Sequence, residues 1–295
     1  MPTVSVIVAT YRHDDMLQRA LESLALQTYK DFEIILVDDN SDDAWNRKVS
    51  DIVYAFSSKY PDVQIELIVN SDNLGSAETR NVGIRCSKGK YITFLDDDDI
   101  YLPKKLEHQL STFIKEDADY GITDLYLYNN NDKLIDKRIR NYITSYSKDA
   151  LLKYHLMFHL TGTDTLMFKK EYLDSINGFD PIDVGDEFYL MQKAIMAGGK
   201  FCYSPHCYVK AYVHSGHGGL SSGEGKIRGE VSLYGYKKQF FNALDKRSIN
   251  YINTRHFAVL AYAYLRMKKY RSFIKYSFKG FFTSPISFCK ILFSR

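Results

Sequence analysis

The chain has 295 residues and a net charge of +3, with 45% apolar and 25% charged residues, as in ordinary soluble proteins. This length allows one large or two small domains, and the composition excludes collagen, coiled-coil rods and wholesale disorder. No run of 18 apolar residues lacks a charge, so we expect no integral membrane helix. The four scattered cysteines and the lack of a signal-peptide pattern favour a reducing, cytoplasmic compartment.

The first hundred residues alternate between strand and helix patterns. Apolar runs rich in β-branched residues predict strands at 4–8, 32–37, 65–69 and 91–95. Stretches with helical spacing or composition predict helices at 16–24, 43–58 and 76–87. This order predicts parallel βαβ units, an α/β fold with helices on both faces of a mostly parallel sheet. In such a fold the carboxyl ends of the strands meet at one edge and form the ligand site.

The alternation weakens after residue 100. Strand-like pieces at 120–128 and 133–139 flank a turn, and six glycines within 214–229 predict a mobile loop. A helical pattern resumes at 231. We therefore divide the chain into residues 1–110, 111–230 and 231–295.

Three of the four predicted strands end in polar residues that could carry chemistry: Thr10 and Tyr11, Asp38 and Asp39, and Asp96–Asp99. Asp96–Asp99 follows an apolar strand, and carboxylates two positions apart can share Mg²⁺ or Mn²⁺, whose shell a nucleoside diphosphate would complete. The alternative is a solvated acidic turn that caps the next helix. Asp38 and Asp39 suit a base or ribose, or belong to an ordinary helix cap. The turn at Gly75 opens a helix bearing Arg80, which suits a phosphate or is a plain surface arginine.

Four segments in this order resemble the family 2 inverting glycosyltransferases with the GT-A fold. They are Val4–Tyr11, Val37–Asp42, Ala77–Gly83 and Phe94–Asp99. The resemblance covers roughly residues 1–225. It implies a Rossmann-like, mostly parallel sheet, a nucleotide-sugar-binding half at 1–110, an acceptor-binding half at 111–230 and a C-terminal helical extension.

The resemblance also implies roles for individual residues. Thr10, Tyr11 and Asp39 would contact the nucleoside, with Arg80 on the nucleotide side. Asp96 and Asp98 would form the metal- and ribose-binding pair of a DXD motif. Because four aspartates stand where the family often has three, the register of this pair is open by one, and Asp97 is kept among the donor contacts.

Two further predictions rest on the same resemblance. Inverting transfer needs a carboxylate that accepts the proton of the acceptor hydroxyl. The acidic pair Asp186 and Glu187 supplies it, and we prefer Asp186, which directly follows a glycine; an acidic helix start favoured by the dipole is the alternative. In the glycine-rich loop, His217 is the expected metal or pyrophosphate contact, with His214 second, although both could be incidental.

The last 65 residues differ sharply from the rest. Residues 231–295 carry a net charge of +12 and 16 of the 43 aromatic residues, whereas residues 1–230 carry −9. Basic and aromatic residues on helices favour peripheral contact with an anionic membrane surface. Simple packing against the rest of the chain is the alternative, and nucleic-acid binding is less favoured.

Together these observations predict a metal-dependent glycosyltransferase that uses Mn²⁺ or Mg²⁺. The expected donor is a UDP-sugar, and the acceptor is a glycan or lipid-linked intermediate of a cell-surface polysaccharide at the inner face of the membrane. The alternatives are a sugar nucleotidyltransferase and a non-catalytic adaptor with the same fold. The first alternative is weakened because residues 10–14 lack the glycine-rich loop that such enzymes need.

Overall fold

A computed structural model describes residues 1–13, 15–182, 185–213 and 223–293. The chain forms two compact units. Unit 1 comprises residues 1–148 and 160–215, and unit 2 comprises residues 149–159 and 216–295.

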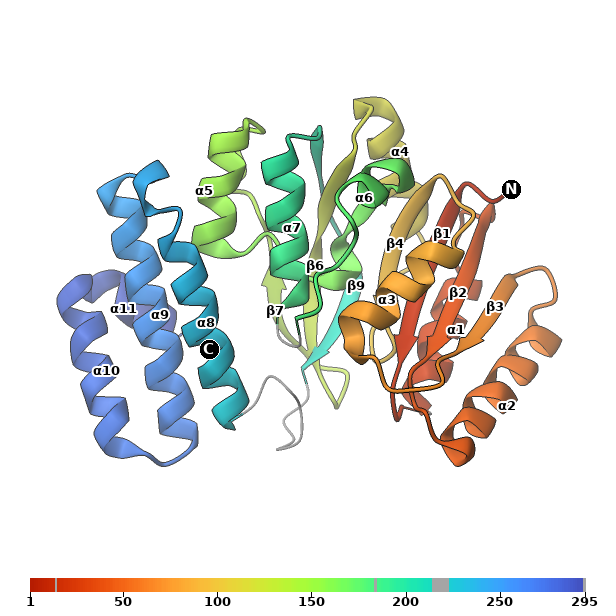
Figure 1. Ribbon diagram of the computed structural model, residues 1–295, viewed down its shortest axis with the longest axis horizontal. Coiled ribbons are helices and arrows are strands. Elements are labelled where there is room, and N and C mark those ends of the chain that lie inside the picture. The colour runs from red at the N-terminus through yellow and green to blue at the C-terminus, as the bar shows by residue number, and fades with distance from the viewer. Residues whose placement is uncertain (14, 183–184, 214–222, 294–295) are drawn as a thin grey trace. The chain divides into compact units, whose positions relative to one another are not determined.

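Unit 1 is built on one mixed sheet, whose described strands number nine (Figure 1). Their spatial order is β3-β2-β1-β4-β8-β6-β9-β5, with β7 paired to β6. The strands are β1 (Val4–Thr10), β2 (Phe32–Asp38), β3 (Gln64–Val69), β4 (Tyr91–Asp96), β5 (Ile100–Tyr101), β6 (Tyr120–Asn129), β7 (Leu134–Arg138), β8 (Met167–Lys169) and β9 (Phe201–Val213).

The four N-terminal strands confirm the predicted parallel sheet. β3, β2, β1 and β4 pair in parallel, whereas β8 runs antiparallel to both β4 and β6. Strands β1 and β2 are buried along almost their whole length, as expected of central strands covered on both faces. Strand β3, at the edge, alternates between exposed and half-buried residues.

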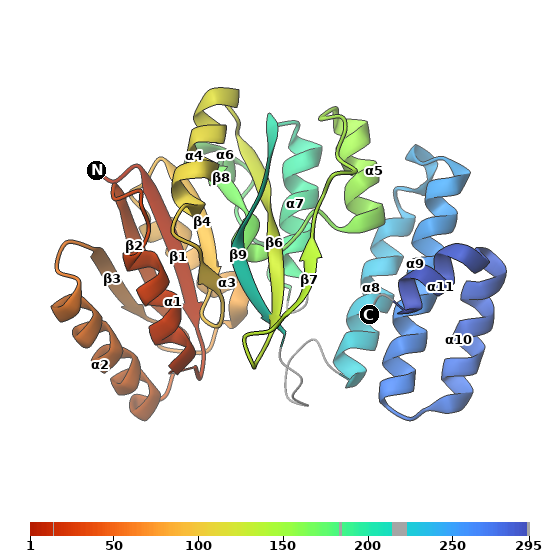
Figure 2. The same cartoon turned by 180° about the vertical axis from the view of Figure 1, so that it is seen from behind.

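Helices cover both faces of this sheet (Figures 1 and 2). One face carries α3, α6 and α7, and the opposite face carries α1, α2 and α4. The bounds are α1 (Asp15–Ala25), α2 (Asp43–Lys59), α3 (Gly75–Cys86), α4 (Lys105–Glu116), α6 (Lys170–Ser175) and α7 (Asp186–Ala197), with a short 3₁₀ helix η1 (Thr163–Thr165). The architecture is the predicted α/β sandwich.

Close packing of α3 on β1 depends on a glycine. A Cβ atom added at Gly83 would lie 2.5 Å from Cγ2 of Ile7, whose side chain comes from β1. Ile7 is fully buried, so neither partner could give way without moving the helix. Gly83 therefore fixes how closely α3 approaches the sheet, and with it the position of Arg80 on the preceding turn.

The register of the parallel strands brings the predicted polar ends together. Thr10 lies opposite Asp38 on β2, and Ala9 lies opposite Asp96 on β4. Asp39 continues the pairing, because its amide donates to the Thr10 carbonyl at 3.0 Å. The expectation that three separate segments meet at one edge of the sheet is confirmed.

Unit 2 is helical in the part that is described. Its helices are α5 (Lys148–Phe158, whose first residue belongs to unit 1), α8 (Gly223–Lys238), η2 (Phe241–Ala243), α9 (Lys246–Arg266), α10 (Tyr270–Thr283) and α11 (Pro285–Phe293). Helix α9 packs against α8, α10 and α11. No described helix in the chain combines the length and the apolar character that crossing a membrane requires.

The predicted glycine-rich loop is wrong at its C-terminal end. Helix α8 begins at Gly223 and includes residues 223–229, while residues 214–222 lie outside the described part of the chain. The helix is held by tertiary contacts, since Ile227 is buried against Leu260 and Ala263 of α9. Burial of this one side chain outweighs the low intrinsic helix propensity of the glycines.

Candidate active site

Asp97 fastens the loop that follows β1 to the end of β4. Its Oδ2 accepts hydrogen bonds from the Thr10 hydroxyl (2.7 Å) and the Tyr11 amide (3.3 Å). Its Oδ1 lies 2.8 Å from Nδ1 of His13. Thr10 and Asp97 are buried, whereas the Tyr11 side chain is exposed. Thr10 and Asp97 therefore fix the conformation of the loop after β1, and the ring of Tyr11 is exposed to solvent at the edge of the sheet.

Asp39 organises the loop that leads into α3. Its carboxylate accepts three hydrogen bonds, from the Asn70 side-chain amide (2.8 Å) and from the backbone amides of Leu74 (2.8 Å) and Gly75 (2.9 Å). Its carbonyl accepts from the Asn73 side chain at 2.9 Å. Gly75 has φ +78°, a conformation that glycine adopts without strain. Asp39 is buried and thereby sets the conformation of this loop.

Arg80 joins two acidic segments that are far apart in the sequence. One terminal nitrogen donates to Oδ1 of Asp96 and the other to Oδ2 of Asp186, both at 2.7 Å. The guanidinium carbon also lies 5.6 Å from the centre of the Phe179 ring. Only 10% of the arginine side chain is exposed. Burial by itself would lower the pKa of Arg80, but the two carboxylates outweigh it and raise the pKa, so this cation is permanent.

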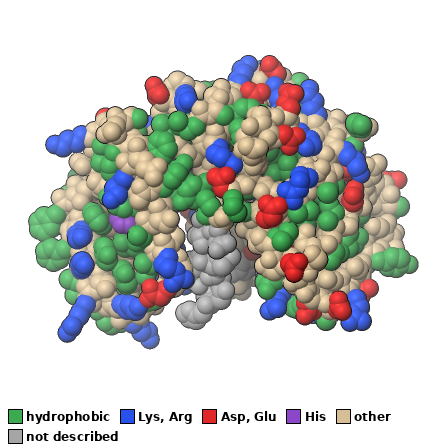
Figure 3. Space-filling model, viewed as in Figure 1, with side chains coloured by type: hydrophobic (Ala, Val, Ile, Leu, Met, Phe, Trp, Pro, Cys, Tyr) green, Lys and Arg blue, Asp and Glu red, His purple; other side chains and the backbone are tan. Residues whose placement is uncertain are grey.

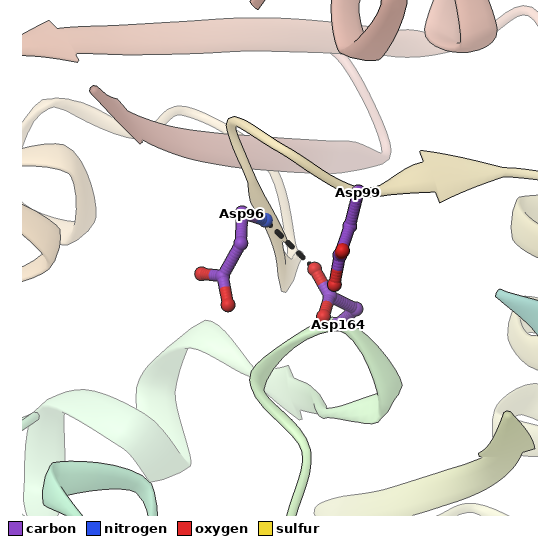
Figure 4. Close-up of side chains that lie close together, drawn as sticks. All are labelled: Asp96, Asp99 and Asp164. Atoms are coloured by element: carbon purple, nitrogen blue, oxygen red, sulfur yellow. Dashed lines mark hydrogen bonds between the residues drawn. The ribbon is translucent and has the colours of Figure 1, made fainter. Parts of the chain in front are cut away.

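Three carboxylates gather beside the end of β4 (Figure 4). Oxygen atoms of Asp96, Asp99 and Asp164 lie within 4.8 Å of one another, and they form a group able to hold a metal ion among the described residues. The Asp96 amide donates to Oδ1 of Asp164 at 2.7 Å. Asp99 also accepts from the Tyr212 amide at 2.7 Å, which links the cluster to β9. The cluster therefore draws on β4, η1 and β9.

Proximity and burial make full ionisation of this cluster unfavourable. Burial, and then the charge of Asp96, raise the pKa of Asp164 to about 7. Burial and the neighbouring Asp164 likewise raise the pKa of Asp99 well above its usual range. Three oxygen donors that repel one another fit a hard divalent cation such as Mg²⁺ or Mn²⁺, which would remove the repulsion.

The aspartates of the predicted acidic motif do not pair in the structure as the sequence pattern predicts. Asp96 belongs to the three-carboxylate cluster, as the predicted metal pair requires. Its predicted partner Asp98 is half-buried and is not among the three residues, whereas Asp99 is. The carboxylate of Asp97 points to the β1 loop instead. The turn after β4 thus directs neighbouring aspartates to different partners.

The acidic pair at the start of α7 has two distinct environments. Asp186 is buried, and its Oδ2 accepts from Arg80 and from the Ser76 hydroxyl (3.3 Å). Its Oδ1 accepts from the Glu187 amide at 2.9 Å. Burial, followed by a hydrogen bond to Asp186, raises the pKa of Glu187 to about 8. Both oxygens of Asp186 are therefore engaged, whereas burial and the neighbouring Asp186 favour the protonated form of Glu187. Gly185, with φ +79°, sets the turn.

Sequence reasoning missed two contributors to the site. Asp164 lies in a 3₁₀ turn between Gly162 and β8, and the sole local signal was one aspartate between two threonines before an apolar strand. Asn70 follows β3, where no sequence pattern distinguishes it from ordinary loop residues. Two predicted residues, His214 and His217, lie outside the described part of the chain.

A buried lysine lies beneath the acidic cluster. Nζ of Lys105 donates to the Thr93 hydroxyl and to the Tyr101 hydroxyl, both at 2.6 Å. The Tyr101 hydroxyl also lies 3.1 Å from the carbonyl oxygen of Asp164. Burial lowers the pKa of Lys105 well below its usual range. This network ties α4, β4 and η1 together and holds the backbone of Asp164 in place.

Comparisons with known proteins agree with this fold. The sequence model described as Glycosyl transferase family 2 matches residues 5–174, more than half of the chain. An Escherichia coli protein named UDP-Glc:alpha-D-GlcNAc-diphosphoundecaprenol beta-1,3-glucosyltransferase WfgD is 30% identical over 145 residues, covering 49% of this chain and 54% of that protein. The chain spans little more than half the length of the first curated relatives that it matches.

Two solved structures share the fold. The first is Staphylococcus aureus TarS, residues 1–349, in complex with UDP-GlcNAc, with a TM-score of 0.61 and 15% identity over 96% of this chain and 91% of that one. The second is the mannosyltransferase PcManGT from Pyrobaculum calidifontis with GDP-Man and Mn²⁺, with a TM-score of 0.62 and 17% identity over 99% and 85%. At these identities the likeness concerns the fold, which is that of GT-A glycosyltransferases.

Proposed function

This chain belongs to glycosyl transferase family 2, and from that membership we propose that unit 1 is an inverting, nucleotide-sugar-dependent glycosyltransferase. One observation carries the proposal. Arg80 holds Asp96, at the end of the parallel sheet, and Asp186, at the start of α7, at 2.7 Å each. The acidic edge of the sheet, which we propose binds the donor, and the acidic pair that starts α7, which we propose supplies the general base, therefore belong to one site.

A UDP-sugar is the donor that we propose. The E. coli relative carries UDP-Glc in its name, and the TarS structure holds UDP-GlcNAc. The nucleoside would lie against Tyr11 and the loops that Thr10 and Asp39 hold in shape. Arg80, a permanent cation within this edge, suits the diphosphate, because a guanidinium matches phosphate oxygens in charge and geometry.

The proposed acceptor is a hydroxyl group of a glycan or lipid-linked intermediate. The name of the E. coli relative specifies a diphosphoundecaprenol-linked acceptor. An acceptor of this kind resides in a membrane, so we propose that the reaction takes place at the inner face of the cell membrane.

The acidic cluster is the proposed site for Mn²⁺ or Mg²⁺. Asp96, Asp99 and Asp164 supply the oxygen donors that lie closest together, and Asp98 in the same turn is the ligand that the sequence pattern favours. When bound, the metal would neutralise charge on the departing diphosphate. These carboxylates would supply, at the end of β4, the oxygen ligands that a hard cation prefers.

We propose Glu187 rather than Asp186 as the general base. Both oxygens of Asp186 accept hydrogen bonds, and its ion pair with Arg80 leaves it poorly placed to take a further proton. Glu187 has a pKa of about 8, so its carboxylate form, the form that can accept a proton, becomes populated as pH rises through this value, and it is then a stronger base than an ordinary glutamate. Asp186 then acts as a positioning residue that orients Arg80 and raises the proton affinity of its neighbour.

The proposed step is a single displacement. The oxygen of the acceptor hydroxyl forms a bond to the anomeric carbon on the face opposite the leaving group. The bond from that carbon to the diphosphate oxygen breaks, and its electron pair leaves with the nucleoside diphosphate. The hydroxyl proton passes to the carboxylate of Glu187, so the configuration at the anomeric carbon inverts.

Transfer assays on two isosteric variants test the choice of base. We expect Glu187→Gln to lower kcat by about 10²–10⁴-fold, the usual contribution of general-base catalysis. Asp186→Asn should retain measurable transfer and move the rising limb of the pH–rate profile to lower pH, because Asp186 raises the pKa of Glu187. Glu171→Gln, an exposed carboxylate on α6, serves as the matched control. If Asp186→Asn abolishes transfer while Glu187→Gln retains it, the assignment is reversed.

Calorimetric titration of UDP, GDP and CDP, with and without Mn²⁺, tests the donor and the metal. We expect binding of UDP that depends on Mn²⁺. Comparing Asp98→Asn with Asp164→Asn then separates the two candidate ligand sets, since the variant that removes a ligand loses the metal dependence. A folded sample that binds none of the nucleotides would contradict the proposed transferase function.

A further inference from the structure

Helix α10 has two apolar faces, and packing within unit 2 uses one of them. Phe273, Tyr276 and Gly280 face inward, where Phe273 and Tyr276 pack against buried residues of α9 and α11. A Cβ atom at Gly280 would lie 2.2 Å from Cδ2 of Phe288, so α10 and α11 approach as closely as they can. The inner face is therefore complete.

The second apolar face of α10 is open to solvent. Its residues recur at helical spacing along α10, and one more exposed apolar residue follows in the first turn of α11: Tyr270, Ile274, Phe278, Phe281, Phe282 and Ile286. Phe282 is 75% exposed and Ile286 is 73% exposed. The rings of Phe278 and Phe282 lie 5.6 Å apart and those of Phe281 and Phe282 lie 6.0 Å apart, so these three rings form a continuous patch rather than isolated exposures. A continuous apolar patch of this kind marks an interaction site.

Cations border this patch, and acidic residues are missing from the sequence around it. Residues 246–295 contain eleven Lys and Arg and no Asp or Glu. On α10 itself, Arg271, Lys275 and Lys279 form no ion pair with a carboxylate among the described residues. In Figure 3, hydrophobic side chains over α9 and α10 are interspersed with Lys and Arg. The patch is therefore complementary to an anionic partner with an apolar interior.

We propose that the outer face of α10 and the α10–α11 turn dock unit 2 on an anionic lipid bilayer. Phe281, Phe282 and Ile286 would enter the boundary between headgroups and acyl chains, with α10 lying along the surface. Arg271, Lys275 and Lys279 would meet lipid phosphates. A bilayer is favoured over a second copy of this chain, because pairing two such faces would bring like charges together. This inference rests on the proposed function in one respect: the membrane is taken to be the cell membrane that holds the proposed lipid-linked acceptor.

Flotation of the full chain with lipid vesicles tests the docking surface. We expect binding to phosphatidylcholine vesicles that contain phosphatidylglycerol, and weak binding to phosphatidylcholine alone. The triple variant Phe278→Ser/Phe281→Ser/Phe282→Ser should bind at least ~10-fold more weakly, because its insertion surface is lost. Arg271→Gln/Lys275→Gln/Lys279→Gln should lose about 100-fold, since each cation near an anionic surface contributes about fivefold. Tyr54→Ser and Lys115→Gln, exposed positions in unit 1, are the matched controls.

A fluorescence probe reports insertion directly. The chain has a single tryptophan, Trp45, so Trp45→Phe/Phe282→Trp places the sole indole in the proposed turn. Its emission should shift to the blue on anionic vesicles and be quenched by brominated lipid, whereas Trp45→Phe/Tyr54→Trp should not respond.

Three outcomes would overturn the docking proposal. They are equal binding by the serine variant and wild type, an unresponsive indole at position 282, and a dimer in sedimentation that the serine substitutions dissolve without any vesicle binding. None of these assays needs donor or acceptor. They can therefore fail while transfer to a water-soluble acceptor persists, and vesicle binding can persist in a chain that fails to transfer.

Discussion

Units 1 and 2 handle charge in opposite ways. Unit 1 gathers acidic groups in its interior, where Asp96, Asp99 and Asp164 crowd together and Arg80 neutralises part of their charge. Unit 2 spreads cations over its surface, and its helices from residue 246 onward carry no carboxylate at all. Electrostatic interactions therefore act over contact distances inside unit 1, and over longer distances through water at the surface of unit 2.

The difference shows where charge constrains a structure. A buried charge loses hydration and must be paired, protonated or bound to a cation, so the aspartates of the site in unit 1 lie against specific partners. An exposed charge keeps its water and is screened within roughly 10 Å, so the exposed cations of α10 cost the fold little. Buried charge should therefore dominate stability, and exposed charge should dominate long-range attraction.

The largest effect is expected from removing Arg80, the buried cation of unit 1. Arg80→Met should lower the free energy of unfolding by about 3–5 kcal/mol, because Asp186 would stay buried, and Asp96 half-buried, without their shared partner. Arg85→Met breaks an exposed pair with Glu78 on the same helix and should cost less than about 1 kcal/mol. Urea unfolding followed by Trp45 fluorescence measures both within unit 1. Equal losses would mean that Arg80 is solvated in solution.

Relieving the acidic cluster should act in the opposite direction. Folded Asp164 keeps its proton up to about pH 7, whereas the unfolded chain loses it near the ordinary value of 3.8. Between these values the folded chain binds more protons, so its stability falls as pH rises. At pH 8, Asp164→Asn should therefore stabilise the metal-free protein by roughly 1–3 kcal/mol.

Two further measurements serve as controls for the Asp164 prediction. Asp51→Asn, an exposed carboxylate on α2, should leave the pH dependence unchanged. Mn²⁺ should raise the melting temperature of the wild-type protein and raise it less for Asp164→Asn, because a ligand that binds only the folded state stabilises it. An Asp164→Asn protein that is less stable than wild type at pH 8 would show that the aspartate is paired rather than repelled.

The smallest effect is expected from the surface of unit 2. Lys275→Gln/Lys279→Gln should change the free energy of unfolding by less than about 0.5 kcal/mol, since both lysines are exposed. The same variant should weaken binding to anionic vesicles, and wild-type binding should decline as salt rises from 0.05 to about 0.5 M. A melting temperature that falls by several degrees would assign these lysines a structural role.

The success of sequence reasoning varied with the range of the interaction. The strands and helices of the first hundred residues were predicted because apolar spacing reports local burial, and the parallel order follows from their alternation. Helix α8 was missed over residues 223–229 because its stability comes from Ile227 packing on α9, a partner found some thirty residues further along the chain. The preference for Asp186 over Glu187 as the base rested on its position after a glycine, and the transfer assays on the two variants decide between them.

The sequence by itself determined the strand–helix order, the polar ends at Thr10, Asp39 and Asp96, and the basic, aromatic character of the last helices, because each is a local pattern. The tertiary structure alone decided which charges meet. It placed Arg80 between Asp96 and Asp186, and it set Asp164 beside Asp99, 65 residues apart in the chain. Such contacts depend on the exact approach of packed elements, down to the missing Cβ of Gly83, and spacing in a sequence does not encode that approach.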